Sequence, residues 1–457
     1  MVEKIERQRQ KEQDRFERRK NFEAVEENFT PEQAHLEASR CLSCKNARCK
    51  QGCPVNIDIP SFIKEIKENN LDKAGDIIRQ SSMLPSVCGR VCPQEKQCEG
   101  KCILGIKDKP VAIGALERYV GDNTKAKKQE IKPNGKKVAI VGSGCAGMSA
   151  AADLRNAGFE VSIFEALHEF GGVLRYGIPP FRLPRTVLDR EIEALKEMGV
   201  KFYKNVVVGK SITIKQLQDE GYCAIFICSG AGLPKMMHIK GENLNGVYSA
   251  NEFLTRVNLM HAQNPDTPTP LKIGKTAAII GGGNVAMDAA RTAVRVGYEK
   301  VYICYRRTEK ELPARLEEIR HAKEEGIEFK FLYAPVEIFG EDGWVKSMKF
   351  ELMELGEPDA SGRQRPVGTG KYTEIPLDSV IVSLGTGPNP IIQRSAQNEH
   401  IDLNTDNKGY IIINEQGETS VTHIYAGGDV APLGPSTAIN AMGAGKRAAK
   451  AIIDALG

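Results

Sequence analysis

The sequence predicts a doubly wound α/β protein with an α-helical segment in front of it. Two stretches, starting near residues 138 and 277, each place a glycine-rich loop between a short apolar strand and an Ala-rich helix, the arrangement that binds a dinucleotide. Ahead of them, eight of the 12 cysteines lie between Cys41 and Cys102. We therefore expect two Rossmann-like domains, the second inserted in the first, behind a helical cysteine-rich domain. The expected ranges are 1–125 for the helical domain, 137–250 and 379–457 for the two parts of the first nucleotide domain, and 251–378 for the second.

The first unit has the GxGxxG pattern in its full structural context. The sequence predicts a buried strand over 138–141, a helix over 148–157 and a second strand over 161–164. The first glycine would make the tight turn, the second would let a pyrophosphate approach, the third would let helix and strand pack closely, and the acid after the second strand would hold a ribose hydroxyl. These residues are Gly142, Gly144, Gly147 and Glu165. A glycine-rich turn in some other α/β protein is the alternative, which the order of the pieces disfavours.

The second unit repeats the pattern but lacks the acid. A strand over 277–280 leads into a GxGxxA loop, a helix over 287–296 and a strand over 301–305. The loop residues expected to contact a nucleotide are Gly281, Gly283, Asn284 and Ala286. At the end of the strand stand Arg306 and Arg307, which can bind a ribose 2′-phosphate that an acid would repel. We expect this site to prefer NADPH over NADH; two surface arginines without a ligand are the alternative.

Two further motifs are expected to complete the first nucleotide site. A glycine pair follows the first unit, and near the C-terminus a strand runs into a Gly-Gly-Asp turn ahead of a Ser/Thr-capped helix over 435–453. The acid of that turn could bind a ribityl or phosphate-bridging group, and the helix N-terminus could face the cofactor or its phosphates. The residues concerned are Gly171, Gly172, Gly428, Asp429, Ser436 and Thr437.

The eight clustered cysteines have the tight spacing of iron–sulfur ligands. Residues 41–54 contain Cys-x2-Cys-x4-Cys-x3-Cys-Pro, and residues 88–102 contain Cys-x3-Cys-Pro followed by Cys-x3-Cys. A Cys-Pro that ends a ligand run is a ferredoxin feature, in which the last cysteine can serve another cluster. Structural zinc prefers paired CxxC knuckles, and only Cys41 and Cys44 have that spacing. The spacing therefore favours two four-iron clusters over zinc.

Composition and charge narrow the remaining possibilities. A net charge of +4 is too small to indicate nucleic acid or a membrane surface, and the apolar runs are too short for a transmembrane helix. Residues 1–30 lack the apolar core of a signal peptide, so a cytoplasmic protein is expected.

The alternating charges of residues 1–30 predict a solvated helix that forms a surface arm, and the polar residues 121–136 predict a linker. Cys223 and Cys228, an odd number of residues apart on a predicted strand, are interpreted as core cysteines.

In combination, these motifs resemble a known family. The residues that carry the match are CLSC…C…CP, CGRVCP, IGALERY at 113–119, VGSGCAG, YGIPPFRLP, GGGNVAMD, YRR and AGGD. The chain is similar to the small (beta) subunits of NADPH-dependent glutamate synthase. The amino-terminal half of dihydropyrimidine dehydrogenase and the large subunit of the NADH-dependent reduced ferredoxin:NADP oxidoreductase share this plan. The resemblance implies FAD in the first unit, NADPH in the second and two [4Fe–4S] clusters in the helical domain.

The resemblance also implies a ligand set for each cluster. One cluster would be held by Cys41, Cys44, Cys49 and Cys102. The other would be held by Cys53, Cys92, Cys98 and the carboxylate of Glu117. Cys88 would then hold no iron, although spacing alone selects it as a ligand. The sequence departs from the family at Cys145, where relatives often have proline.

The family implies an oxidoreductase that passes electrons between NADPH, FAD and the clusters, without a side chain acting as general base. The acceptor is expected to be a partner subunit, because the chain has no stretch resembling a (β/α)8 barrel of about 250 residues. That partner would be the large subunit of glutamate synthase, which forms glutamate from glutamine and 2-oxoglutarate. If the chain were instead the large subunit of a bifurcating ferredoxin:NADP oxidoreductase, the partner would be a small flavoprotein. A subunit that supplies electrons for sulfide or pyrimidine reduction is a further option. A non-catalytic cluster-binding relay and a zinc-knuckle interaction module are the alternatives of other classes.

Overall fold

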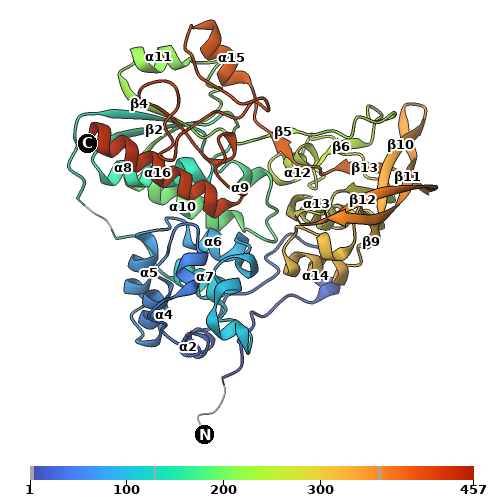
Figure 1. Ribbon diagram of the computed structural model, residues 1–457, viewed down its shortest axis with the longest axis horizontal. Coiled ribbons are helices and arrows are strands. Elements are labelled where there is room, and N and C mark those ends of the chain that lie inside the picture. Colours follow the sequence, from blue (N-terminus) through green and yellow to red (C-terminus); the bar gives the residue numbers. More distant parts are fainter. Residues whose placement is uncertain (1–4, 128–129, 359–361) are drawn as a thin grey trace.

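Three units meet at one junction in the computed structural model, which describes residues 5–127, 130–358 and 362–457. A helical unit lies on one side of two units that each contain a parallel sheet (Figure 1). The C-terminal segment returns to the first of these two units and adds a strand at the edge of its sheet. The architecture is the predicted α/β fold, in which the second nucleotide unit interrupts the first.

The helical unit consists of short helices joined by tight turns. Helix α2 begins with a capping box between Thr30 and Gln33 and with proline at its first position, both strong start signals. Phe62, Ile63 and Leu116 are fully buried in its core, together with the cysteines Cys53 and Cys98. The elements of this unit are α1 (Arg15–Arg18), α2 (Pro31–Ser39), α3 (Arg48–Gly52), α4 (Ile59–Lys67), α5 (Leu71–Arg79), α6 (Pro85–Val91), η1 (Gln94–Lys96), η2 (Glu99–Lys101), η3 (Ile103–Ile106) and α7 (Ile113–Asn123).

The first nucleotide unit is built on a five-stranded parallel sheet in the order β15-β4-β1-β2-β3. Its central strand β1 is buried over four consecutive residues, as expected of a strand covered on both faces. Two long helices, α8 and α16, pack against each other on one face. The strands are β1 (Lys137–Val141), β2 (Glu160–Phe164), β3 (Lys201–Tyr203), β4 (Tyr222–Ile227) and β15 (Ile424–Ala426). The helices are α8 (Cys145–Asn156), α9 (Val173–Tyr176), α10 (Arg185–Glu197), α11 (Ile214–Asp219), α15 (Ile391–Asn398), η5 (Gly428–Val430) and α16 (Ala438–Leu456).

The second nucleotide unit has its own five-stranded sheet in the order β6-β13-β7-β8-β9. Strands β6 and β13 lie just outside the range 251–378 that we expected for this unit. Because both strands belong to its sheet, the unit begins a few residues earlier and ends a few residues later than expected. The strands are β6 (Val247–Ser249), β7 (Thr276–Ile280), β8 (Lys300–Tyr305), β9 (Glu328–Phe331) and β13 (Ser379–Val382). The helices are α12 (Ala250–Asn258), α13 (Asn284–Val296), η4 (Glu309–Glu311) and α14 (Leu316–Glu324).

Between β9 and β13 the chain forms an antiparallel three-stranded ribbon at the side of the second unit (Figure 1). We expected only short strands here, whereas β11 and β12 have 15 and 13 residues. Most side chains of β12 are solvent-exposed, so the strand lacks the apolar alternation that a sequence pattern needs. The ribbon strands are β10 (Tyr333–Glu341), β11 (Trp344–Pro358) and β12 (Gln364–Pro376), and β5 (Leu233–Pro234) pairs with β14 (Thr386–Gly387) where the chain crosses between units. Within the described residues, no helix has the length and apolar character needed to cross a membrane.

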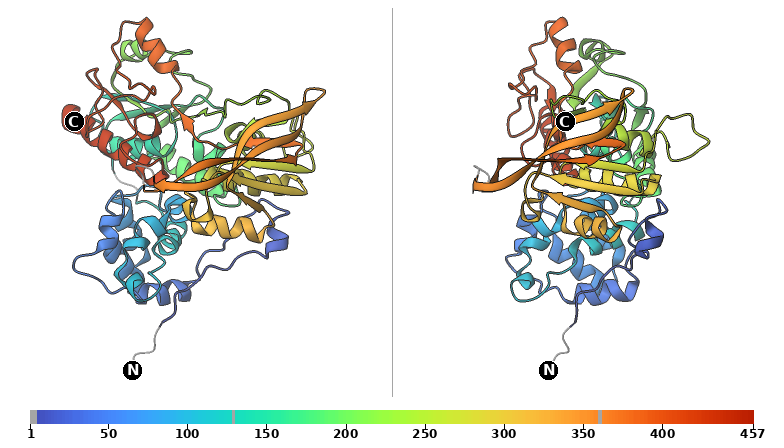
Figure 2. Two further views of the ribbon diagram at one scale, coloured as in Figure 1. Left: turned by 45° about the vertical axis from the view of Figure 1, so that its right-hand side comes forward. Right: turned by 90° about the vertical axis from the view of Figure 1, so that its right-hand side faces the viewer.

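The N-terminal segment is a strap and not the solvated helix that its charges predicted. The only helix in residues 5–30 is the four-residue α1. The strap doubles back on itself, since Gln13 N–H donates to the Val25 carbonyl and Val25 N–H donates to the carbonyl of Phe181 in the first nucleotide unit. Figure 2 shows the strap crossing from the helical unit to the second nucleotide unit. Some of its charges, such as Arg18, are paired with another unit, and others pair within the strap, as Lys11 does with Glu27 and Lys20 with Glu17.

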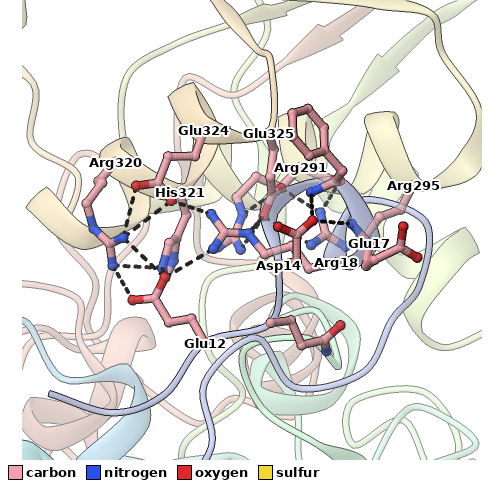
Figure 3. A network of polar contacts seen from close by, with 12 residues as sticks. Glu12, Asp14, Glu17, Arg18, Arg291, Arg295, Arg320, His321, Glu324 and Glu325 are labelled. Carbon is pink, nitrogen blue, oxygen red and sulfur yellow. Dashed lines mark hydrogen bonds and ion pairs between the residues drawn. The ribbon is translucent and has the colours of Figure 1, made fainter.

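A buried ion network fixes the strap to helices α13 and α14 (Figure 3). Arg18, 1% exposed, donates to Glu325 at 3.0 Å and to Glu324 at 2.7 Å. The fully buried Glu325 also accepts from Arg291 at 2.9 Å and Arg295 at 2.6 Å. Burial alone would raise the pKa of Glu325, but the two guanidiniums of α13 outweigh it and hold that pKa at about 2. The carboxylate therefore stays charged throughout the neutral range.

Glu325→Gln should lower the free energy of unfolding by about 3 kcal/mol, because three guanidiniums lose their common counter-charge. Urea unfolding followed by the fluorescence of Trp344, the single tryptophan, measures this in the second nucleotide unit. Since the folded pKa lies below the ordinary carboxyl value of about 4.3, the stabilisation is present above about pH 4 and is lost as the pH falls toward 2. Glu17→Gln, in an exposed pair with Lys20, is the control and should cost about 0.5 kcal/mol or less. Equal losses in the two variants would contradict a structural role for the network.

Candidate functional site

The first glycine loop is shaped to leave its middle open. Gly142 has φ +115°, and a Cβ there would lie 2.6 Å from the carbonyl oxygen of Cys228, the residue after β4. A Cβ at Gly147 would lie 2.1 Å from the Gly142 carbonyl oxygen, so helix and loop are in closest contact at this point. At Gly144, in contrast, a Cβ would meet no heavy atom within 4 Å. The loop thus presents an open cradle at the N-terminus of α8, which fits a pyrophosphate.

Glu165 ties this loop to the glycine pair that follows the unit. Its buried carboxylate accepts from the Ser143 N–H at 3.0 Å, the Ser143 hydroxyl at 2.5 Å and the Leu167 N–H at 2.9 Å. The Gly171 N–H in turn donates to the Ser143 hydroxyl oxygen at 2.9 Å, and a Cβ at Gly172 would come within 3.1 Å of the Gly144 Cα. A carboxylate has about four acceptor positions, so one remains for a ribose hydroxyl.

The C-terminal Gly-Gly-Asp turn lies over the start of α8. A Cβ at Gly428 would stand 3.3 Å from the Ala146 Cβ. Burial raises the pKa of Asp429, and a hydrogen bond from Ser436 opposes that shift. The structure thus brings Asp429 and Ser436 together, whereas the Thr437 hydroxyl caps α16 by accepting from the Asn440 N–H at 3.3 Å.

Tyr176 is a residue of this site that the sequence motifs did not select. Burial, together with the charges of Asp429 and Glu165, raises its pKa to about 12, so the phenol stays protonated. It lies on the short helix α9, directly after the Gly171–Gly172 turn. Only its place in the motif YGIPPFRLP could have drawn attention to it.

The second glycine loop repeats the open cradle but uses two of its expected residues differently. Gly281 has φ +141° with a Cβ position 2.3 Å from the Ser383 carbonyl oxygen, and Gly283 faces open space. Ala286 is fully buried in the core of the unit. The side-chain oxygen of Asn284 accepts from the Arg315 N–H at 2.9 Å, so this residue positions the segment ahead of α14.

That segment joins the second nucleotide unit to the helical unit. The Arg315 guanidinium donates to the Arg90 carbonyl at 2.8 Å and to the Gln94 side-chain oxygen at 2.7 Å. Gln94 in turn donates to the Gly89 carbonyl at 3.1 Å, within the CGRVC turn. The glycine loop and the cysteine turn are thus mechanically connected through two side chains.

The two adjacent arginines at the end of β8 have different surroundings. Arg306 is exposed beside the glycine loop. Arg307 is only 6% exposed, and its Nε donates to the Gln364 carbonyl of the ribbon at 2.8 Å. The structure therefore does not bring them together as an equivalent pair, because residues that follow each other at a strand end point in opposite directions.

Four of the eight clustered cysteines line one apolar cavity in the helical unit. Cys41, Cys44, Cys49 and Cys102 surround it. Ile59 and Ile63 of α4 form part of its wall. Burial raises the pKa of Cys49 to about 11, with the neighbouring Cys102 and Cys41 adding to the shift. Thiols this close in an apolar pocket suit the thiolate ligation of a cluster.

A second group of ligands gathers between α6, η2 and α7. Burial raises the pKa of Cys53 to about 11, and Glu117 is the nearest charge that adds to the shift. Cys92 and Cys98 also lie within the electrostatic range of Glu117. Burial raises the pKa of Glu117 itself to about 8, and its Oε1 has no hydrogen-bond partner among the described residues. An orphaned, buried carboxylate oxygen among thiols fits a metal ligand.

Cys88 lies against this second group, where its side chain interacts with Cys92 and lies within electrostatic range of Cys53. It is 1% exposed, receives a long 3.9 Å contact from the Ser82 hydroxyl and, like Cys92, belongs to the core cluster that contains Cys145 of α8. Cys223 and Cys228 contact separate carbonyls, those of Lys137 and Gly142, and every described cysteine is a free thiol. Cys228 is buried, as expected of a core cysteine, whereas Cys223 is only half-buried.

Comparison with known proteins agrees with this division of the chain. Residues 136–445 match the family model described as pyridine nucleotide-disulphide oxidoreductase, and residues 18–129 match that described as dihydropyrimidine dehydrogenase domain II, 4Fe-4S cluster. In fold, the chain resembles FprA of Mycobacterium tuberculosis, solved in complex with NADPH, with a TM-score of 0.58 and 24% identity over 71% of this chain and 85% of that one. Thioredoxin reductase of Lactococcus lactis gives a TM-score of 0.54 at 22% identity, over 70% of this chain and all of that one.

Relatives of known name match nearly the whole chain. The glutamate synthase [NADPH] small chain of Halomonas elongata is 36% identical over 96% of this chain and 94% of its own length, and that of Escherichia coli is 36% identical with the same coverage. The NADP(+)-dependent formate dehydrogenase subunit beta of Moorella thermoacetica is 38% identical over 89% of this chain and 59% of its own length. The chain is therefore an NADPH-dependent oxidoreductase that belongs to the pyridine nucleotide-disulphide oxidoreductase family and to the family of the glutamate synthase [NADPH] small chains.

Proposed function

We propose that this chain is the electron-input subunit of a two-component enzyme of the glutamate synthase type, taking electrons from NADPH and delivering them to a partner subunit. The observation that carries the proposal is the presence, in one chain, of two open glycine cradles and two groups of clustered cysteine ligands. Bound FAD and [4Fe–4S] clusters would supply the conversion of two-electron to one-electron chemistry. The chain's own part is to bind these groups, orient them and exclude water.

The binding roles follow from the geometry of each site. In the first unit, the loop at Gly144 and the free acceptor position of Glu165 would hold the pyrophosphate and ribose of FAD, and Asp429 and Tyr176, which lie within electrostatic range of each other, would also face the cofactor. In the second unit, the cradle at Gly283 would hold the pyrophosphate of NADPH. Arg306 would hold its 2′-phosphate, because it is the arginine exposed beside the loop.

The two ligand groups lie at different distances from the nucleotide units. Helix α6, which leads into Cys92, packs against α10 and α16 of the first nucleotide unit. The cavity of Cys41, Cys44, Cys49 and Cys102 is walled by α4, which lies at the far end of the helical unit (Figure 1). This order supports electron entry at the Glu117 group and exit at the α4 cavity. In glutamate synthase the partner that receives the electrons would be a large subunit.

Cys98→Ser should remove about half of the iron from anaerobically prepared protein, whereas Cys88→Ser should retain all of it. Cys98 lies beside Glu117, whereas Cys88 lies beside both Cys92 and Cys145, so the iron content of Cys88→Ser decides whether Cys88 or Glu117 completes the ligand set. Glu117→Gln should resemble Cys98→Ser, because an amide cannot supply the anionic ligand. Iron and acid-labile sulfide analysis measures the outcome. Loss of half the iron in Cys88→Ser would reverse the assignment of these ligands.

Arg306→Ala should raise KM for NADPH at least tenfold and leave KM for NADH unchanged, since a charge-assisted contact to a phosphate contributes about 1.5–3 kcal/mol. Initial rates with ferricyanide as acceptor measure both. Arg307→Ala is the matched control, and its main effect should be on stability because its side chain is buried against the ribbon. An equal loss for both nucleotides in Arg306→Ala would remove the phosphate role.

Anaerobic affinity purification of the tagged chain from its own host, with identification of co-purifying proteins, tests the partner. We expect a large subunit with an amidotransferase domain and a barrel domain. A small flavoprotein in its place would make the chain a subunit of a ferredoxin-linked transhydrogenase. Recovery of a chain without iron or flavin, and without NADPH oxidation, would contradict the proposed function itself.

A further inference from the structure

The surface over the α4 cavity combines exposed apolar side chains with a local excess of positive charge. Leu42 and Ile106, from the two segments that carry the cavity's cysteines, are 59% and 68% exposed. Large apolar side chains with this exposure, next to a functional cavity and rimmed by polar residues, are typical of a protein interface. We call the exposed surface of residues 42–50 and 101–109 the α4-cavity face.

The charge on this face is almost entirely positive. Its exposed cations are Lys45, Arg48, Lys50, Lys101, Lys107 and Lys109. Its one acid is Asp108, which lies 3.7 Å from the Arg40 guanidinium. Of the six cations, only Lys50 has an ion pair with another described residue, at 3.9 Å from Asp58. The whole chain has a net charge of only +4, so this face carries a local excess.

The two segments form one continuous surface. A Cβ at Gly52 would lie 2.8 Å from the Lys101 side chain, which places the end of α3 against η2. Arg40, directly before Cys41, donates to the Lys109 carbonyl at 2.7 Å. Leu42, Arg48, Ile103 and Leu104 all line the cavity of the four cysteines. The cations therefore surround the same opening from both sides.

From these contacts we infer that the α4-cavity face is the docking surface for the electron-accepting protein, and that this partner presents acidic side chains around an apolar patch beside its own redox group. The inference rests on the proposed function and specifies its partner. Positive charge around an electron exit would steer an acidic partner and set its orientation, while Leu42 and Ile106 would exclude water from the centre of the contact. A second copy of this chain is a poor occupant, because like charges would face each other.

An acidic plant-type [2Fe–2S] ferredoxin serves as the probe, since it combines surface acids with one redox group. Binding to the holoprotein at low salt should weaken at least tenfold in Lys45→Glu/Lys107→Glu/Lys109→Glu, and the salt dependence of binding should decrease. The triple variant Lys210→Glu/Lys371→Glu/Lys408→Glu has the same change in net charge on the exposed surface of the nucleotide units and should bind within twofold of wild type. Ile106→Ser, together with the matched control variant Val367→Ser/Ile412→Ser at exposed apolar positions elsewhere, tests the apolar part of the contact. Ile106→Ser should weaken binding without changing its salt dependence, and the control should bind as wild type does.

NADPH-dependent ferricyanide reduction and iron content should match wild type in all four variants, which separates this inference from the proposed function. Loss of ferricyanide reduction in the wild-type protein would contradict the function, while its retention together with unchanged ferredoxin binding in the lysine variant would overturn the docking surface. Equal weakening of ferredoxin binding by the two triple variants would show that only the net charge of the protein matters, and would also overturn the docking surface. Self-association of the wild-type protein that is lost in the variants of the α4-cavity face would likewise overturn the inference, because the face would then bind a second copy of this chain.

Discussion

The relative arrangement of the three units depends on a carboxylate that has no contact with water. Glu325 lies where the N-terminal strap, α13 and α14 meet, and three guanidiniums from two different units surround it. A buried charge is tolerated only while its counter-charges remain in place, so separating the units would expose an expensive set of unpaired ions. Phe181 of the first nucleotide unit closes the same cluster, with the Arg291 and Arg295 guanidiniums 4.7 and 4.0 Å from its ring centre. One ion cluster thereby holds all three units in register.

This fixed arrangement gives the two nucleotide cradles and the cysteine turns their relative positions. Asn284, at the start of α13, holds the Arg315 backbone, and the Arg315 side chain donates to the Arg90 carbonyl of α6 and to Gln94 of η1. The helical unit also reaches the first nucleotide unit through α6, which packs on α10 and α16. Contacts of this kind suit electron transfer between fixed groups, which needs short, constant distances and exclusion of water more than it needs proton-transferring side chains.

Local sequence patterns predicted the elements whose determinants are close in the chain. Glycine spacing, apolar strands and Ala-rich helices placed β1, α8, β7 and α13 to within a few residues, because each is specified by its own periodicity. The strap could not be predicted in this way, since Arg18 finds its partner 307 residues away and its charges look like those of a solvated helix. The surroundings of Arg307 could not be predicted for a similar reason: the carbonyl that accepts from its Nε belongs to Gln364, on a ribbon that has no clear pattern of its own. The orphaned oxygen of Glu117 likewise becomes evident only when the thiols have been placed around it.

The strap also has a consequence for the order in which the protein is completed. It is the first described segment to be synthesised, yet its anchors on α13 and α14 emerge only after most of the chain has been made. Until then Arg18 lacks the counter-charge of Glu325, and the strap cannot dock. The helical unit can therefore fold early, while its connection to the second nucleotide unit forms late. Docking of the strap would therefore report that α13, α14 and the segment of Phe181 have been brought together. A truncated or stalled chain would carry the cysteine unit without the contacts that hold it against its electron source.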